Sequence, residues 1–252
     1  MSAVLSCFKN LLETSTVSLA AGTADSTYPL YRLYDRVIGK MFKTTAAVTT
    51  EVQVDQGASG NLAADRLLIP AGHNLSGMTL DILYSDNGSA WSTAVTQWVQ
   101  ADNNLIDKSW ASITHRYWKF KITSPASIPQ IPEIFLTQTY TWERNPSLPL
   151  GPIDDVFNVE NVVTSGGQDR FLTHGSAKRQ RQYKCTGASE TQRASITLLN
   201  AAWAGGKPFW LYDHEGTAIY GKLKEPLNLI QTGENNTGGL FSFDINFLEV
   251  LP

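Results

Sequence analysis

Four histidines carry the most obvious capacity for acid–base or metal chemistry, and they are His73, His115, His174 and His214. None of them has a second ligand at the short spacing that a metal site requires. The run Asp213-His214-Glu215-Gly216 could hold a cation weakly, but between two strands such a run is typical of a hairpin turn. We therefore expect no metal site.

Motifs for nucleophilic, metal-dependent or nucleotide chemistry are absent from the sequence. It contains no G-x-S-x-G elbow, H-E-x-x-H helix, G-x-x-x-x-G-K-[ST] loop or G-x-G-x-x-G run. Asp154 and Asp155 are paired carboxylates, but adjacent residues of an extended chain point to opposite faces, which suits a shared substrate poorly. We predict no catalytic residue and no cofactor, and we expect that the protein is not an enzyme.

Three tryptophans are the main candidates for a ligand contact. Trp91, Trp98 and Trp110 lie in or near segments that connect expected strands. Exposed aromatic rings beside Asp or Asn side chains can bind glycans on the loops of a β-sandwich. Tryptophans also fill sandwich cores or pack against a neighbouring subunit, and this is their commoner role. Glycan contact, subunit contact and core packing all stay open for these three residues.

Charge and hydropathy exclude two classes of partner. The net charge is −3, with eleven Lys/Arg against twelve Asp/Glu in residues 1–150 and nine against eleven in residues 151–252. Neither half is a basic nucleic-acid module, and the basic cluster at 178–184 is expected to be a solvated face or a protein contact. No stretch approaches the about 18 apolar residues of a membrane-spanning helix. We expect no nucleic-acid partner and no membrane insertion.

Apolar and polar residues alternate along much of the first half, which predicts strands with one buried face. The expected strands are 48–55, 65–70, 78–84, 95–100, 116–123 and 131–140. Trp118, Phe120 and Ile122 should share a buried face, and the Asp-Asn-Gly run at 86–88 should form a tight turn. This spacing of short strands is typical of a β-sandwich.

A proline-rich segment, residues 145–152, is predicted to be a linker, because three prolines and a glycine in eight residues do not fit a helix or a central strand. The expected organisation is an N-terminal arm at 1–27, a sandwich at 28–144, this linker, and a β-rich domain at 153–252. In the last domain one short helix is expected to begin with a capping box at Ser189. The predicted fold class is mainly β, a β-sandwich followed by a β-rich domain with one short helix.

The first half resembles the discoidin-like, or galactose-binding-like, modules of tailed-bacteriophage tail proteins. The segment 28–36 is similar to a P-x-x-x-L-x-D opening, 65–75 to a strand that ends in G-H-N-L, and 84–91 to an S-D-N-G-x-x-W hairpin. The segments 40–44, 116–120 and 132–136 also match, and all of the matching segments keep the order that they have in the family. The second half resembles, less specifically, the β-rich assembly domains that accompany such modules.

The resemblance implies a structural component of a phage tail tip, a distal tail or baseplate protein. Its implied partners are further copies of itself, in a ring, trimer or hexamer, and other tail proteins such as tail tube, hub, fibre or tape-measure proteins. It would be assembled in the bacterial host cytoplasm and reside in the virion. In many distal tail proteins the ring-forming domain comes first, whereas here the discoidin-like half is expected first. The alternative is a carbohydrate-binding adsorption protein that contacts host surface glycans.

Overall fold

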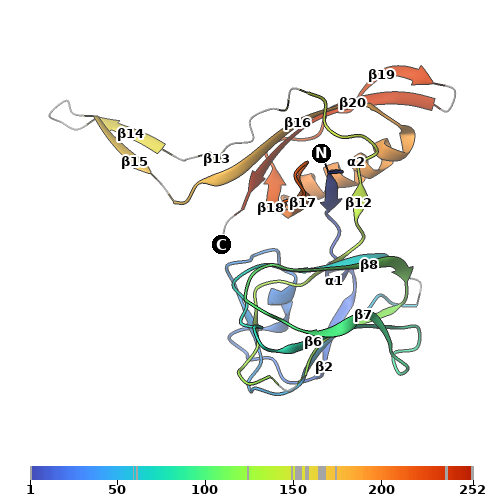
Figure 1. The fold of residues 1–252 in the computed structure, drawn as a ribbon, viewed down its shortest axis with the longest axis vertical. Helices are drawn as coiled ribbons and strands as arrows, with labels where there is room; N and C mark the ends of the chain where they lie inside the picture. Colours follow the sequence, from blue (N-terminus) through green and yellow to red (C-terminus); the bar gives the residue numbers. More distant parts are fainter. Residues whose placement is uncertain are drawn as a thin grey trace. The chain divides into compact units, whose positions relative to one another are not determined.

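The computed structural model describes residues 2–250 except 59, 61, 124, 149, 151–154, 157–158, 164–168, 174 and 236–237. The chain forms two units (Figure 1). Unit 1 comprises Met1–Phe8 and Tyr140–Leu251, and unit 2 comprises Lys9–Thr139. Unit 2 is therefore inserted into the sequence of unit 1.

Unit 2 is built from two antiparallel sheets. The larger has the strand order β2 (Thr16–Ala21), β4 (Thr50–Asp55), β9 (Tyr117–Thr123), β6 (Thr79–Ser85) and β7 (Ser92–Val99). The smaller has the order β11 (Phe135–Thr137), β5 (Ala63–Ile69) and β8 (Ile106–Thr114). A short pair, β3 (Phe42–Lys43) with β10 (Gln130–Ile131), and two single-turn helices, α1 (Leu11–Thr14) and η1 (Leu30–Leu33), complete the unit.

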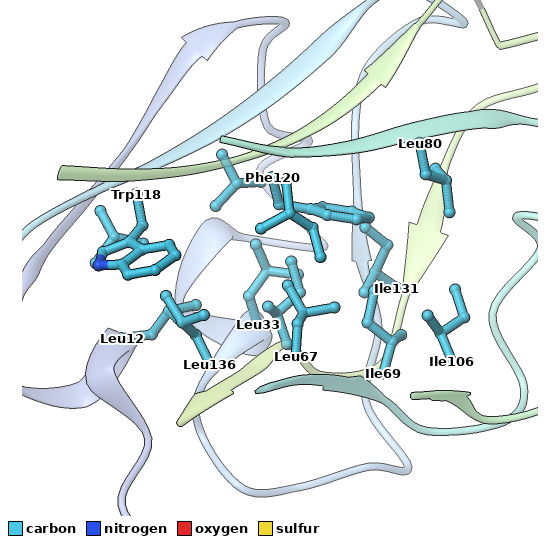
Figure 2. Close-up of a cluster of buried hydrophobic side chains, with 14 of the residues drawn as sticks. Leu12, Leu33, Leu67, Ile69, Leu80, Ile106, Trp118, Phe120, Ile131 and Leu136 are labelled. Carbon is cyan, nitrogen blue, oxygen red and sulfur yellow. The ribbon is translucent and has the colours of Figure 1, made fainter. Parts of the chain in front are cut away.

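The core of unit 2 lies between these two sheets. Trp118 and Phe120 from β9 meet Leu67 and Ile69 from β5 in a cluster of buried side chains (Figure 2). Alternate residues of a strand point to opposite faces, so each strand contributes every second side chain to this cluster. The β-sandwich expected for the first half is confirmed, with its predicted buried face on β9.

Unit 1 contains a sheet in which the first and last parts of the chain meet. Its strands are in the order β12 (Tyr140–Thr141), β1 (Leu5–Cys7), β17 (Phe209–Tyr212), β18 (Ala218–Leu223), β20 (Gly238–Glu249), β16 (Lys178–Ala188) and β13 (Asp155–Val156), with β19 (Ile230–Asn235) also paired to β20. The hairpin β14 (Val159–Val163) and β15 (Asp169–Thr173) forms a separate two-stranded sheet. The mainly β fold class is confirmed.

Helix α2 (Glu190–Ala204) begins where the sequence predicts. The hydroxyl of Ser189 accepts the backbone N–H of Thr191 at 3.2 Å and that of Gln192 at 3.4 Å. Gln192 does not complete a capping box, because its Oε1 accepts the N–H of Glu143 at 2.9 Å. Ile196 is buried on the face of α2 that packs on the sheet. No helix among the described residues is long and apolar enough to cross a membrane.

The arm and the linker differ from the expected organisation. Residues 1–27 do not form a separate arm, because β1 joins the sheet of unit 1 and β2 joins the larger sheet of unit 2. The boundary between the units falls after Thr139, ahead of the proline-rich segment 145–152. Besides β1 and β2 in the expected arm, the strands β8 and β19 were not expected. Both are rich in polar residues and resemble loops in sequence, yet each pairs with an apolar neighbouring strand.

Candidate functional site

The chain enters and leaves unit 2 at one end of the sandwich. Thr16, the first residue of β2, lies opposite the last residue of β4. Thr139, the last residue of the unit, donates its backbone N–H to Asp65 Oδ1 near the start of β5 at 2.8 Å. The loops at 70–78 and 100–105 connect strands at the other end, which we call the distal end. The distal end is therefore the end of unit 2 away from the two points where the chain enters and leaves it.

His73 holds the two distal loops together. Its Nδ1 accepts the backbone N–H of Leu75 at 3.1 Å, and its Nε2 therefore carries the proton and donates to the carbonyl of Asn104 at 2.7 Å. Asn103 Oδ1 adds a bond from the N–H of Ser76 at 2.9 Å. Burial lowers the pKa of His73. This histidine is a neutral bridge between loops and not a metal ligand.

Replacement of His73 by alanine is expected to destabilise unit 2 by about 1–3 kcal/mol, because the carbonyl of Asn104 and the N–H of Leu75 lose a buried partner. In wild type the contribution of His73 is complete above its unfolded pKa of about 6.5 and is lost as the pH falls, since only the unfolded state protonates freely. Thermal unfolding at about pH 7.5 and about pH 5 measures both effects. If the alanine variant lost as much stability as wild type on acidification, His73 would not be the acid-sensitive group.

A half-buried tryptophan and a row of polar side chains flank the distal loops. Trp98, near the end of β7, donates its Nε1–H to Gln100 Oε1 at 3.1 Å, and Gln100 Nε2 lies 3.4 Å from Asp102 Oδ1. Asn104 donates its backbone N–H and its amide to the two oxygens of Asp102 at 3.0 and 2.9 Å. Lys108 Nζ lies 4.8 Å from the centre of the Trp98 ring. We call these five residues the Trp98 surface.

The Trp98 surface combines an apolar ring with exposed hydrogen-bonding groups. The backbone N–H of Asn104, followed by its side-chain amide, lowers the pKa of Asp102, so this carboxylate stays ionised and acts only as an acceptor. The amides of Gln100 and Asn104 can both donate and accept. A flat apolar face beside such groups matches a sugar, whose ring has an apolar C–H face and a rim of hydroxyls.

The structure separates the three tryptophans that the sequence singled out. Trp91 precedes β7 and Trp98 lies near its end, so the two lie at opposite ends of one strand. Trp91 has Lys119 Nζ 4.2 Å from its ring centre. Trp110 on β8 donates its Nε1–H to the carbonyl of Ala64 at 3.0 Å, and both Trp110 and Trp98 pack in part against the core of unit 2. The three residues do not form one platform, and a glycan or subunit contact for each remains a prediction.

The sequence did not identify the polar members of the Trp98 surface. Gln100, Asp102 and Asn104 are common loop residues, and nothing in their order distinguishes them from an ordinary turn. The one sequence feature that could have identified them is their position directly after Trp98, near the end of an expected strand. Lys108 reaches the same surface only because β8, which the sequence did not predict, runs beside β5.

The opposite end of the sandwich carries a second group of polar side chains. His115 Nδ1 lies 2.9 Å from Asp86 Oδ1, and the His115 ring stacks on Tyr84 with 4.1 Å between the ring centres. Arg116 donates to both oxygens of Asp55 at 2.7 and 3.0 Å. These groups already pair with one another, and they lie at the end where the chain enters and leaves. A ligand would have to compete with those pairs.

The Asp213–Gly216 turn of unit 1 is structural. Asp213 is fully buried, and its Oδ2 accepts from Arg181 Nε at 3.0 Å. His214 Nδ1 lies 3.0 Å from the hydroxyl of Tyr183. No group of three His, Cys, Asp or Glu side chains suited to a metal ion occurs among the described residues. His174 and Asp154, considered in the sequence, lie outside that part of the chain.

An open groove of about 590 Å³ runs along β16 and β20 in unit 1. Its lining includes the charged side chains of Lys184, Glu225 and Asp244. The charges are mixed, and the one aromatic residue of the lining, Phe243, is buried. The described lining of this groove therefore has no partly exposed aromatic ring, whereas the ring of Trp98 is half-buried.

Comparisons with solved structures find similarity to carbohydrate-binding modules and glycosidases. Chitosan-binding module 1 of a chitosanase/glucanase from Paenibacillus sp. IK-5 is 14% identical, with 52% of this chain and 99% of that chain covered and a TM-score of 0.44. A pectin-binding carbohydrate-binding module is 17% identical, with 49% and 89% covered and a TM-score of 0.39. No family model and no curated protein matches the chain.

A Ruminococcus gnavus GH29 fucosidase in complex with fucose is 16% identical, with a TM-score of 0.45. The match covers 52% of this chain and only 27% of the fucosidase chain. At these identities no ligand and no activity passes from these proteins to this one. None of the three structures named here is a bacteriophage tail protein.

Proposed function

We propose that unit 2 is a carbohydrate-binding module and that the Trp98 surface is its binding site. The observation that carries the proposal is the row from the Trp98 indole through Gln100 and Asp102 to Asn104 at the distal end. It provides an apolar ring beside donors and acceptors already oriented by hydrogen bonds. Preorganised side chains lose less conformational entropy when a ligand binds. This corresponds to the adsorption role that the sequence left as the alternative.

The indole ring of Trp98 supplies the apolar part of the contact. Lys108 lies over this ring through a long, flexible side chain, which can move aside or bond a sugar oxygen. The amides of Gln100 and Asn104 and the carboxylate of Asp102 then meet hydroxyls at the rim of the sugar. Binding needs no nucleophile or acid–base pair, and we propose a binding role without turnover.

Replacement of Trp98 by alanine is expected to weaken binding of a host polysaccharide about tenfold or more, because stacking area and the orienting bond to Gln100 are lost together. Isothermal titration against ligands selected on a glycan array measures the change. Asp102→Asn keeps the shape but replaces an acceptor by a donor, and a smaller loss is expected.

Trp91→Ala is the matched control, since Trp91 is also half-buried, lies at the other end of β7 and has a lysine over its ring. Saturable binding that survives in Trp98→Ala but is lost in Trp91→Ala would place the binding site at the Trp91 end of β7. It would contradict the assignment of the site to the Trp98 surface. Turnover of the bound polysaccharide by the purified protein would contradict a role in binding alone.

A second candidate function is a structural component of a phage tail tip. Two observations favour it. Unit 1 contributes the first strand of the chain, so the sandwich is inserted into unit 1 and does not simply precede it. The hairpin β14–β15 pairs with no other described strand, and an isolated hairpin is marginally stable in water unless something covers it. Mass measurement of the purified protein tests this candidate, and a strict monomer that is absent from virions would eliminate it.

A further inference from the structure

Asn87 and Gly88 form the only asparagine–glycine pair in the sequence. They lie in the turn between β6 and β7, at the end of the sandwich opposite the distal loops. A side chain on the residue after an asparagine hinders the approach of its backbone nitrogen to the asparagine Cγ, and glycine has no such side chain. Asn87 is exposed, so water reaches its amide. Ring closure to a succinimide therefore meets little steric resistance at this pair.

The side-chain oxygen of Asn87 is surrounded by donors. Its Oδ1 accepts the backbone N–H of Ser89 and that of Ala90, both at 2.9 Å. The Ser89 hydroxyl lies 3.0 Å from the same oxygen. Two backbone donors identify this atom as the oxygen of the amide and not the nitrogen. Donors aimed at a carbonyl oxygen stabilise the negative charge that develops on it when a nucleophile attacks the carbon.

The Ser85 hydroxyl connects the backbone nitrogen of Gly88 to this oxygen. It accepts the N–H of Gly88 at 3.0 Å and donates to Asn87 Oδ1 at 3.1 Å. It also accepts the N–H of Asn87 at 3.2 Å, which fixes its position. Ser85 is only 4% exposed. One buried hydroxyl therefore joins the proton of a nucleophile to the oxygen that must receive a proton.

We propose that Asn87 is a modification site at which the turn forms a succinimide, with Ser85 as the proton relay. The Gly88 nitrogen forms a bond to Asn87 Cγ, its proton passes to Ser85 Oγ, and the Ser85 proton passes to Oδ1. The Cγ–Nδ2 bond then breaks, and Nδ2 leaves as ammonia with the proton of the new hydroxyl. Water opens the succinimide to aspartate or isoaspartate. The net reaction of asparagine and water gives a carboxylic acid and ammonia.

Mass spectrometry of the full chain, incubated and then digested, measures the modification. The peptide that contains Asn87 should first lose ammonia and then gain water. Ser85→Ala should slow this reaction about a hundredfold, because a positioned proton-transfer group is lost. Ser85→Thr keeps the hydroxyl and should retain most of the rate. The matched control Ser89→Ala removes another hydroxyl from the same oxygen but leaves the Gly88 contact, and a loss of less than about tenfold is expected.

The pH profile separates a proton relay from a purely structural role of Ser85. A hydroxyl relay needs no hydroxide, so the wild-type rate should be nearly constant between about pH 7.5 and about pH 9, above the usual titration range of carboxylates and histidines. The groups beside the turn are Asp86, which pairs with His115 at 2.9 Å, and the Tyr117 ring, which stacks with Arg116. In the chain unfolded by denaturant the nitrogen must lose its proton to hydroxide, and the rate should rise in proportion to hydroxide.

A wild-type rate that rises with hydroxide as it does in the unfolded chain would overturn the inference. Equal or faster reaction in Ser85→Ala would overturn it as well, and so would a wild type that reacts no faster than the unfolded chain at about pH 7.5. Trp98→Ala should leave the rate unchanged, because the turn lies at the other end of the sandwich. This result is therefore separable from that for the proposed function.

Discussion

Replacement of Asp213 by alanine is expected to lower the free energy of unfolding of unit 1 by about 3–5 kcal/mol. Asp213 is fully buried, and the Arg181 side chain that donates to it is only 8% exposed. Loss of the carboxylate leaves a buried guanidinium without its counter-charge. Asp213 Oδ1 also accepts the N–H groups of Glu215 and Thr217 at 3.0 and 2.8 Å, so the turn loses its acceptor too.

Denaturant unfolding measures this loss, and hydrogen exchange in β16, β17 and β18 locates it in unit 1. The double variant Arg181→Met, Asp213→Ala should be more stable than Asp213→Ala alone, because it contains no unpaired buried charge. A single variant that loses less than about 1 kcal/mol would show that water or another group replaces Asp213.

The Glu133→Gln variant is expected to abolish most of the stability loss that unit 2 suffers as the pH rises. Glu133 is fully buried, and neither of its carboxylate oxygens has a hydrogen-bond partner among the described residues. Burial raises the pKa of Glu133 to about 9, although the neighbouring Arg36, which pairs with Glu13, acts to lower it. The folded protein therefore holds a proton that the unfolded chain releases.

The sign of the effect follows from this difference in proton binding. A raised folded-state pKa makes the contribution of Glu133 complete below the unfolded value of 4.5 and removes it progressively up to about 9. The slope can reach about 1.4 kcal/mol per pH unit. Glutamine keeps the shape and never ionises, so the slope should largely disappear. Chemical denaturation at several pH values measures it.

Glu215→Gln is the matched control, because the Glu215 side chain is 61% exposed and the same substitution there should leave the slope unchanged. A wild-type protein as stable at pH 9 as at pH 5 would contradict a buried neutral Glu133, since its ionisation would then cost nothing.

The strands of the core could be predicted because burial on one face imposes a pattern on the sequence. Trp118, Phe120 and Ile122 alternate with residues that face the other way, and all three are buried. The helix at Ser189 was predicted because its cap depends on residues close in sequence. The strand β8 was missed because it pairs with β5, which is distant in sequence, and β19 was missed because its polar residues do not alternate with apolar ones, although it pairs with the next strand, β20.

The candidate site could be predicted only in part. Trp98 was identified by residue type, but the same reasoning gave Trp91 and Trp110 equal weight. The register of β7 against β6 separates Trp98 from Trp91, since it places Trp98 opposite Leu80 and leaves Trp91 beyond the other end of the strand. The prediction of a separate arm at 1–27 was wrong for a related reason. The strands of this segment pair with β17 and β4, which lie far along the chain.

The sequence alone determined the local and periodic features of this protein: the mainly β class, most strands, the helix cap and the absence of familiar catalytic motifs. The tertiary structure alone decided which residues meet. It inserts unit 2 into unit 1, and it buries Glu133 with no hydrogen-bond partner for its carboxylate among the described residues. Side-chain spacing along a strand or helix follows from backbone geometry, whereas contacts between distant segments depend on how all strands pair and pack together.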